Sequence, residues 1–127
     1  MELIKVETAK APEALGPYSQ AIKAGDFLYC SGQVPLVPGT GELVAGGIEA
    51  QTRQSLENLL YVLGAAGTDF NSVVKTTIYL TDLGDFAVVN GIYAGYCGDV
   101  SPARATVQVA ALPKGALVEI DAVAYLG

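Results

Sequence analysis

Two segments near the C-terminus alternate polar and apolar side chains, and they hold the residues best suited to chemistry. Period-two alternation puts Arg104 and Thr106 on one face of a predicted strand, and Glu119 and Asp121 on one face of the next. A hairpin between the two strands would set these polar faces side by side, on the side of the sheet that no helix covers. A guanidinium in such a place can hold a planar carboxylate through two parallel hydrogen bonds.

The more ordinary interpretation of this alternation is a structural ion pair. Arg104 would then pair with Glu119 across neighbouring strands of a solvated face, which is what alternating charges on strands usually form. Spacing alone favours the ion pair over a binding site, and it leaves both alternatives open.

Two other polar positions add weight to a site. Asn90 falls four residues after Phe86, on or beside the apolar stripe of a predicted helix. A polar amide there is either a hydrogen-bonded core residue, which is the commoner case, or part of a pocket lining. Ser31-Gly32 ends a predicted strand with a hydroxyl group and a backbone that permits close approach. By itself this pair indicates only a turn.

Periodicity predicts the elements that must position these residues. Apolar residues recur at helical spacing from Gly47 to Gly67, and a second helical stripe follows Asp82, which can cap it. Turns or loops are predicted at Gly25-Asp26, Pro35 to Gly47 and Leu112 to Gly115. The predicted strands cover Tyr18 to Ala24, Phe27 to Cys30, Val73 to Leu80, Arg104 to Val109 and Leu117 to Ala124. This order predicts an α+β fold, an α/β sandwich in which one mixed sheet carries two helices on one face.

Composition limits the classes of function. The chain of 127 residues suffices for a single domain, 1–127. A net charge of −6 argues against a nucleic-acid partner. The absence of histidine excludes nucleophiles activated by imidazole and the usual zinc ligands, so no metal site is expected. The isolated cysteines, Cys30 and Cys97, favour reduced, buried thiols over a disulfide.

The balance of charged and apolar residues points to an oligomer. Charged residues make up 16% of the chain, against about 25% in a typical soluble domain, while hydrophobic residues reach 51%. A chain this small has more apolar surface than one core can hide. The N-terminal residues lack the apolar core of a signal peptide, and no run approaches the ~20 apolar residues of a membrane span. The expectation is a soluble, cytoplasmic protein without a membrane partner.

The whole chain resembles the Rid family of reactive-intermediate deaminases, also called the YjgF or L-PSP family. The most specific segment is Pro102-Ala103-Arg104-Ala105-Thr106, which continues to Leu112-Pro113-Lys114-Gly115 and Val118 to Ala122. Further matching segments are Gly16 to Gln20, Ser31 to Pro35, Gln54 to Asn58, Val74 to Thr77 and Phe86 to Asn90. The resemblance implies a mixed six-stranded sheet with two helices on one face, like chorismate mutase of the trimeric Bacillus type. Three subunits would turn their sheets inward and form pockets at the subunit clefts.

The resemblance also implies an activity and residue roles. Rid proteins hydrolyse reactive 2-imino acids, such as 2-iminobutanoate and 2-iminopropanoate, to 2-oxo acids and ammonia without a cofactor. By motif, Arg104 matches the arginine that binds the substrate carboxylate, and Glu119 matches the carboxylate that positions water. The remaining lining is matched by Tyr18, Ser31, Gly32 and Asn90. Thr106 stands where many bacterial members have cysteine, so a thiol role is not carried over. An imine is already electrophilic, so orientation and a positioned water suffice for its hydrolysis.

Two other functions stay open. The family's name is also attached to an endoribonuclease that inhibits translation, although negative charge and the lack of histidine argue against that activity here. The other alternative is a non-catalytic small-ligand binder, or a chaperone-like trimer, that uses the same clefts.

Overall fold

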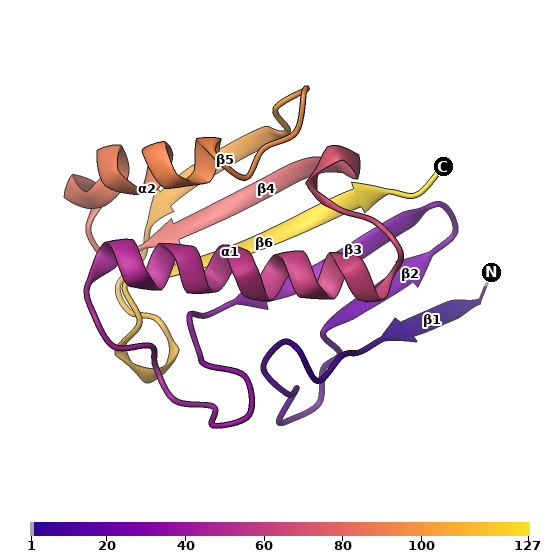
Figure 1. The fold of residues 1–127 in the computed structure, drawn as a ribbon, viewed down its shortest axis with the longest axis horizontal. Coiled ribbons are helices and arrows are strands. Elements are labelled where there is room, and N and C mark those ends of the chain that lie inside the picture. Colours follow the sequence, from indigo (N-terminus) through magenta and orange to yellow (C-terminus); the bar gives the residue numbers. More distant parts are fainter. Residues whose placement is uncertain (1) are drawn as a thin grey trace.

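The computed structural model describes residues 2–127 as one six-stranded sheet with two helices on one face (Figure 1). The strands are β1 (Leu3–Val6), β2 (Ala21–Ala24), β3 (Phe27–Gln33), β4 (Val73–Leu80), β5 (Ala103–Gln108) and β6 (Val118–Tyr125). The helices are α1 (Ile48–Ala65) and α2 (Phe86–Ala94). The strand order is β1-β2-β3-β6-β4-β5, in which β4 and β5 run parallel and the other neighbours antiparallel. The predicted α+β class with a mixed sheet is confirmed.

The core lies between the sheet and α1. Leu56, Leu59 and Leu63 recur at helical spacing and are fully buried, and α1 packs mainly on the central strand β6. From β6, Ile120 and Ala122 point into the same core. Because β6 is buried on this side, its outward residues are confined to the other face of the sheet. Neither helix is long and apolar enough to cross a membrane.

Several boundaries differ from the predicted ones. The strand β4 has the predicted ends, and Gly25-Asp26 forms the predicted hairpin turn, with Gly25 at a φ of 61°. The strand β2 begins at Ala21 instead of Tyr18, because the buried side chain of Gln20 binds the backbone of residues 8–12 and keeps the preceding chain in a loop. The strand β3 runs on through Ser31-Gly32 to Gln33, and β1 was not predicted at all.

The predicted hairpin between the last two strands is wrong. β5 pairs in parallel with β4, and β6 lies between β3 and β4. The reason is the connection through α2, which crosses over from the end of β4 and delivers β5 in the same direction. The turn at Pro113–Gly115, in which Lys114 adopts a φ of 58°, then returns the chain to the centre of the sheet.

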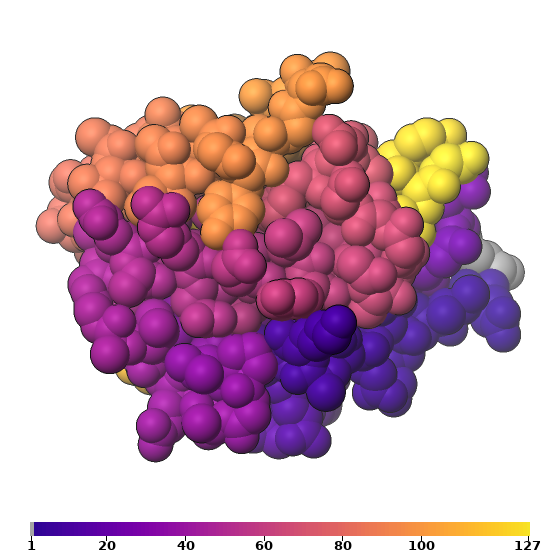
Figure 2. Space-filling view, in the orientation of Figure 1, coloured from indigo at the N-terminus to yellow at the C-terminus, as the bar shows by residue number. Residues whose placement is uncertain are grey.

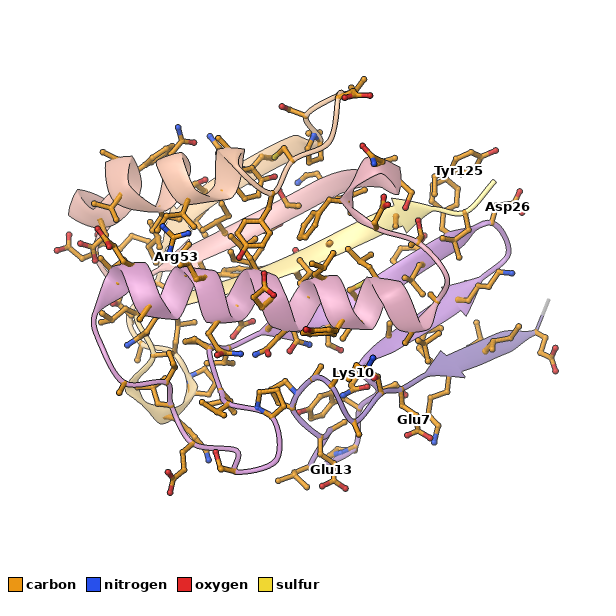
Figure 3. The ribbon with its side chains drawn as sticks, in the orientation of Figure 1. Glu7, Lys10, Glu13, Asp26, Arg53 and Tyr125 are labelled. Carbon is orange, nitrogen blue, oxygen red and sulfur yellow. The ribbon has the colours of Figure 1, made fainter. Side chains whose placement is uncertain are left out.

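The face of the sheet without helices, called here the open face, is largely apolar. Register places on it five large hydrophobic side chains that are 39–66% exposed. They are Leu3, Phe27, Tyr29, Val107 and Tyr125. The rings of Phe27 and Tyr125 pack at 5.3 Å between centroids, and Figure 3 places Tyr125 near Asp26 at one end of the sheet. The opposite side is closed by the side chains of α1 and α2, which adjoin in the space-filling view (Figure 2).

Candidate functional site

The arginine cluster consists of Arg104 and three residues of α2. Arg104 leaves β5 on the helix side and its Nη1 donates a hydrogen bond of 2.7 Å to Asn90 Oδ1. Its guanidinium carbon lies 5.3 Å from the ring centroids of both Phe86 and Tyr93. Phe86, Asn90 and Tyr93 are four and three residues apart, so they form one face of α2. The helix therefore presents two aromatic faces and an amide oxygen to a single guanidinium.

Arg104 retains most of its hydrogen-bonding capacity. A guanidinium carries five N–H donors, and Asn90 accepts from one of its nitrogens. Within residues 2–127, no carboxylate lies within ion-pair distance of Arg104. The interpretation of Arg104 as a structural partner of Glu119 is therefore wrong, and its guanidinium is available to an anionic ligand.

Thr106 follows Arg104 on the same side of β5, two residues along the strand. Its Oγ1 is buried and has no hydrogen-bond partner among the residues that the structure describes. Thr106 thus places a spare hydroxyl on the Arg104 side of the strand.

The glutamate cluster gathers the other predicted site residues around β3: Tyr18, Ser31, Gly32 and Glu119. A Cβ at Gly32 would overlap Glu119 Oε2, so the carboxylate lies directly against the β3 backbone. Ser31 donates its hydroxyl hydrogen to the Ser19 carbonyl at 2.5 Å. Tyr18 is 55% exposed, and with Gly32 it lines a small cavity of about 50 Å³. The continuation of β3 through Ser31-Gly32 is what brings the glycine opposite Glu119.

The surroundings of Glu119 disfavour its charge. Burial, and then the negative charge of Asp121, raise the pKa of Glu119. Asp121 is held in place because its two carboxylate oxygens accept hydrogen bonds of 3.0 Å from the Thr77 N–H and the Tyr79 hydroxyl. A carboxyl group with a raised pKa is a better proton acceptor near neutral pH than an ordinary glutamate.

The two clusters lie on opposite faces of the sheet. In register, Arg104 lies beside Thr76, whose side chain is fully buried under the helices, whereas Glu119 lies beside Tyr79 on the open face. The predicted common face for Arg104 and Glu119 is therefore wrong. The polar residues of β5 point to the helix side because β5 is an edge strand and the nine-residue α2 leaves it partly uncovered. The open side of β5 carries apolar residues such as Val107.

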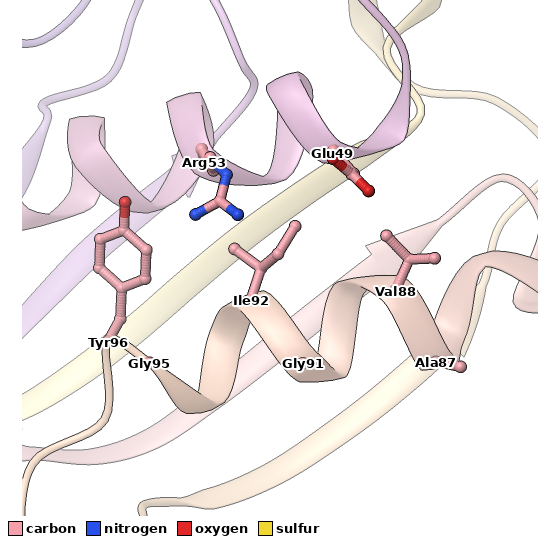
Figure 4. A pocket seen from close by; sticks show the side chains of 8 residues that line it. All are labelled: Glu49, Arg53, Ala87, Val88, Gly91, Ile92, Gly95 and Tyr96. Carbon is pink, nitrogen blue, oxygen red and sulfur yellow. The ribbon is translucent and has the colours of Figure 1, made fainter.

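A larger hollow lies elsewhere, between α1 and α2 (Figure 4). It has a volume of about 620 Å³, and Glu49 and Arg53 of α1 face Val88 and Ile92 of α2 across it. None of the predicted site residues lines this hollow. It is therefore separate from both clusters.

The cysteines and acidic residues form no further centre. Cys30 and Cys97 are both free thiols, and burial, then the charge of Asp121, raise the pKa of Cys30 to about 12. In the part of the chain that the structure describes, no group of three or more Cys, Asp or Glu side chains could hold a metal ion.

Sequence reasoning missed two members of the arginine cluster. It gave Phe86 and Tyr93 no role at the site, and in the structure the guanidinium of Arg104 lies over both rings. The spacing of the two rings around Asn90 was the available signal, since residues on one helical face can surround one ligand. The sequence did not show that β5 would lie next to this face of α2.

The fold and the two clusters define a class: a small α+β protein with one arginine over two aromatic rings at a sheet edge, without an ion-pair partner among residues 2–127, and a half-buried glutamate on an open sheet face. The family described as "Endoribonuclease L-PSP" matches residues 8–126. The chain therefore belongs to this family, and its resemblance to the Rid proteins is confirmed.

Relatives of this chain match it over nearly the whole length. A 2-iminobutanoate/2-iminopropanoate deaminase of Mus musculus is 53% identical, over 96% of this chain and 90% of its own. The Rid-family protein YyfA of Yersinia pestis is 53% identical, with a TM-score of 0.95 over 98% and 99% of the two chains. TdcF of E. coli, solved with bound serine, is 41% identical, with a TM-score of 0.91 over 96% and 98%. The six-stranded architecture is thus shared with solved structures of the family.

Proposed function

We propose that this protein hydrolyses 2-imino acids, such as 2-iminobutanoate and 2-iminopropanoate, to 2-oxo acids and ammonia. The observation that carries the proposal is Arg104, a stacked guanidinium with no carboxylate partner among the described residues. The name of the Mus musculus relative supports the reaction, and the serine bound to TdcF supports a site for small molecules with an α-carboxylate.

Substrate binding would depend on the planar fork of Arg104. Two parallel N–H bonds to the substrate carboxylate would fix both the position and the plane of the adjoining C=N group. The Asn90 amide oxygen orients the guanidinium from the other side. Ser31, Gly32, Tyr18 and Thr106 are proposed to complete the lining around the imino acid.

The chemical step would need one water and one proton acceptor. The substrate would react as the iminium ion, whose nitrogen already carries the extra proton. Glu119 would accept a proton from water as the water oxygen bonds to the iminium carbon, and would pass that proton to the nitrogen of the carbinolamine. Glu119 would then accept the hydroxyl proton as the C=O bond forms and the C–N bond breaks, and the departing ammonia would take up that proton as ammonium. The raised pKa of Glu119 suits a group that must both accept and donate a proton during the reaction. No metal or organic cofactor takes part in this scheme.

The proposed site requires a second copy of the chain. Arg104 and Glu119 leave opposite faces of one sheet, so within one chain they cannot reach the same small substrate. The apolar open face offers a surface for other copies, and the 50 Å³ cavity beside Gly32 is too small to enclose an imino acid alone. We propose a homotrimer in which the arginine cluster of one protomer faces the glutamate cluster of the next.

We do not assign RNA as a substrate. The family's description contains the word endoribonuclease, but the net charge of −6 opposes binding of a phosphate backbone. We propose that the protein binds neither nucleic acid nor membranes. Its cytoplasmic location stays a prediction from the sequence.

The direct test is acceleration of imine hydrolysis. A dehydratase that uses pyridoxal phosphate, or an amino-acid oxidase, would generate the imino acid, and release of the 2-oxo acid would be followed with and without the protein. Faster release at constant dehydratase activity supports the proposal. Equal rates at micromolar protein, with the trimer intact, would refute the deaminase and leave the non-catalytic binder and the ribonuclease, which an RNA-cleavage assay on the same preparation separates.

A further inference from the structure

Tyr93 links the arginine cluster to the buried sheet. Its hydroxyl lies 2.7 Å from Thr76 Oγ1, in a fully buried hydrogen bond between α2 and β4. Thr76 is the residue that lies beside Arg104 in the parallel register. The tyrosine is therefore attached to the strand next to the one that carries the arginine, at the same level along both strands.

The guanidinium fits between two rings. Phe86 and Tyr93 are seven residues apart on α2, which corresponds to about 10.5 Å along the helix axis. The guanidinium carbon is 5.3 Å from each ring centroid, so it is equally distant from the two rings. Asn90, placed between the two aromatic residues, accepts its hydrogen bond from the same side.

A single hydrogen bond to Asn90 would leave the guanidinium free to rotate about that bond. Two aromatic faces remove this freedom, because a cation is held most strongly over the ring face. The plane of the guanidinium sets the plane in which it binds a carboxylate. We propose that Phe86 and Tyr93 are positioning residues that hold the guanidinium plane of Arg104, with the Tyr93 hydroxyl fixed by Thr76. The kinetic part of this inference rests on the proposed function.

The variants distinguish the effect of an aromatic ring from the effect of the Tyr93 hydroxyl and from damage to the fold. Phe86→Leu removes a ring at a position that is 36% exposed, so the fold should survive. Phe86→Tyr keeps the ring and is the rescue variant. Tyr93→Phe keeps the ring but removes its bond to Thr76. A misplaced binding group can lower the rate of a positioned reaction by up to about 100-fold, and we expect kcat/KM to fall about tenfold in Phe86→Leu and in Tyr93→Phe.

Tyr96→Phe is the matched control. The Tyr96 hydroxyl also makes a hydrogen bond, of 2.7 Å to Glu57 Oε2, and so joins the chain just after α2 to α1. Among residues 2–127 it makes no hydrogen bond or cation–π interaction with Arg104, so its loss should leave kcat/KM and product binding unchanged. A fall in Tyr96→Phe as large as in Tyr93→Phe would mean that any loosening of α2 lowers activity, and would overturn the positioning role of Tyr93.

A second readout does not depend on turnover. The chain has two arginines, Arg53 and Arg104, so its ¹⁵N NMR spectrum has two arginine Nε–H signals, and Arg104→Lys assigns them. Ring currents should shift the Arg104 signal upfield, and Phe86→Leu should reverse part of the shift. Calorimetry should show 2-oxobutanoate binding about tenfold more weakly to Phe86→Leu, with Phe86→Tyr close to the parent.

The two proposals fail in distinguishable ways. If the parent protein does not hydrolyse imines, the proposed function falls, while ring-current shifts and weaker 2-oxobutanoate binding would still support the positioning role. An unshifted Arg104 signal, together with unchanged 2-oxobutanoate binding in Phe86→Leu, would overturn the positioning role even if the parent is an active deaminase.

Discussion

Gly32 and Glu119 are packed so closely that the glutamate carboxylate occupies the space where any other residue at position 32 would place its Cβ. Gly32 does not have a positive φ, so its lack of a side chain serves this contact and not an unusual backbone conformation. The glycine therefore sets where the carboxylate of Glu119 lies.

Gly32→Ala should displace the Glu119 carboxylate and lower kcat/KM about tenfold or more. Overpacking should also cost about 1–3 kcal/mol of unfolding free energy. Steady-state kinetics and thermal unfolding measure the two effects. Gly64→Ala is the control, since a Cβ at Gly64 meets nothing within 4 Å and its helical position favours alanine. Parent-like turnover in Gly32→Ala would show that the carboxylate does not need this position.

Arg104→Ala should lower kcat/KM about 100-fold or more, because charge-assisted bonds to the substrate carboxylate are lost. Arg104→Lys should lose much of the activity as well, since a point charge cannot reproduce the planar fork. Because Arg104 is exposed and has no ion-pair partner among residues 2–127, the unfolding free energy should change by less than about 1 kcal/mol. Parent-like turnover per folded Arg104→Ala chain would contradict the proposed function.

The activity should depend on pH through Glu119. Only the ionised carboxylate accepts a proton from water, so kcat/KM should fall as the pH drops through the pKa of Glu119. Burial and Asp121 raise this pKa, so the fall should occur at a higher pH than for an ordinary glutamate. Asp121→Asn removes the second cause and should move the fall to lower pH. Rates corrected for spontaneous hydrolysis give the pH profile. An identical profile in Asp121→Asn would show that the fall in activity at low pH comes from the titration of another group.

The same raised pKa predicts an effect on stability. A carboxyl group whose pKa is raised by folding stabilises the fold most below its unfolded pKa, and this contribution is lost as the pH rises through the folded pKa. Glu119→Gln should therefore have a higher Tm than the parent at neutral pH, with the difference shrinking in acid. A lower Tm at neutral pH would mean that the charge of Glu119 stabilises the native assembly.

Two inactive variants should restore activity when combined. If a site takes Arg104 from one protomer and Glu119 from the next, refolding equal amounts of Arg104→Ala and Glu119→Gln chains should return about a quarter of the parent activity, by random assembly of a ring. Each variant refolded alone is the control. No recovery from mixed trimers, verified by mass spectrometry, would place both residues of a working site in one chain and remove the composite arrangement.

No RNA cleavage should survive purification. The net charge of −6 and the absence of histidine motivate this expectation. Labelled RNA incubated with gel-filtered fractions measures it. Cleavage that follows the protein peak and disappears in Glu119→Gln would show that the protein is a ribonuclease. The argument from charge would then be wrong.

The local sequence pattern predicted most of the helices and strands, but not which strands pair with one another in the sheet. The β-branched run from Val73 to Leu80 became β4 with both ends correct, because an apolar run bounded by turns leaves little choice. β1 was missed because Leu3–Val6 is a short, exposed edge strand without an alternating pattern. The chain from Tyr18 to Gln20 looked like part of a strand, and only the tertiary hydrogen bonds of Gln20 keep it in a loop.

The candidate residues were found by motif, and their arrangement was not. Alternation correctly separated Arg104 from Ala105, but the assumption that the polar side faces away from the helices failed on an edge strand. For β6 the same assumption held, because Ile120 and Ala122 fill the core. Which strand lies between two others depends on crossover connections, and these leave no trace in local periodicity.

The edge of the sheet that carries Arg104 should also open before the rest of the molecule. α2 buries only Val89 and Tyr93, and no residue of β5 is fully buried, whereas α1 and β6 hold the largest buried side chains. Segments with few buried contacts exchange their amide hydrogens through local openings that leave the remaining fold intact. On warming, a protomer would thus lose its binding of the substrate carboxylate while α1 and the central strands were still folded. We therefore expect heat inactivation at a lower temperature than global unfolding, because opening of α2 and β5 alone would cause it.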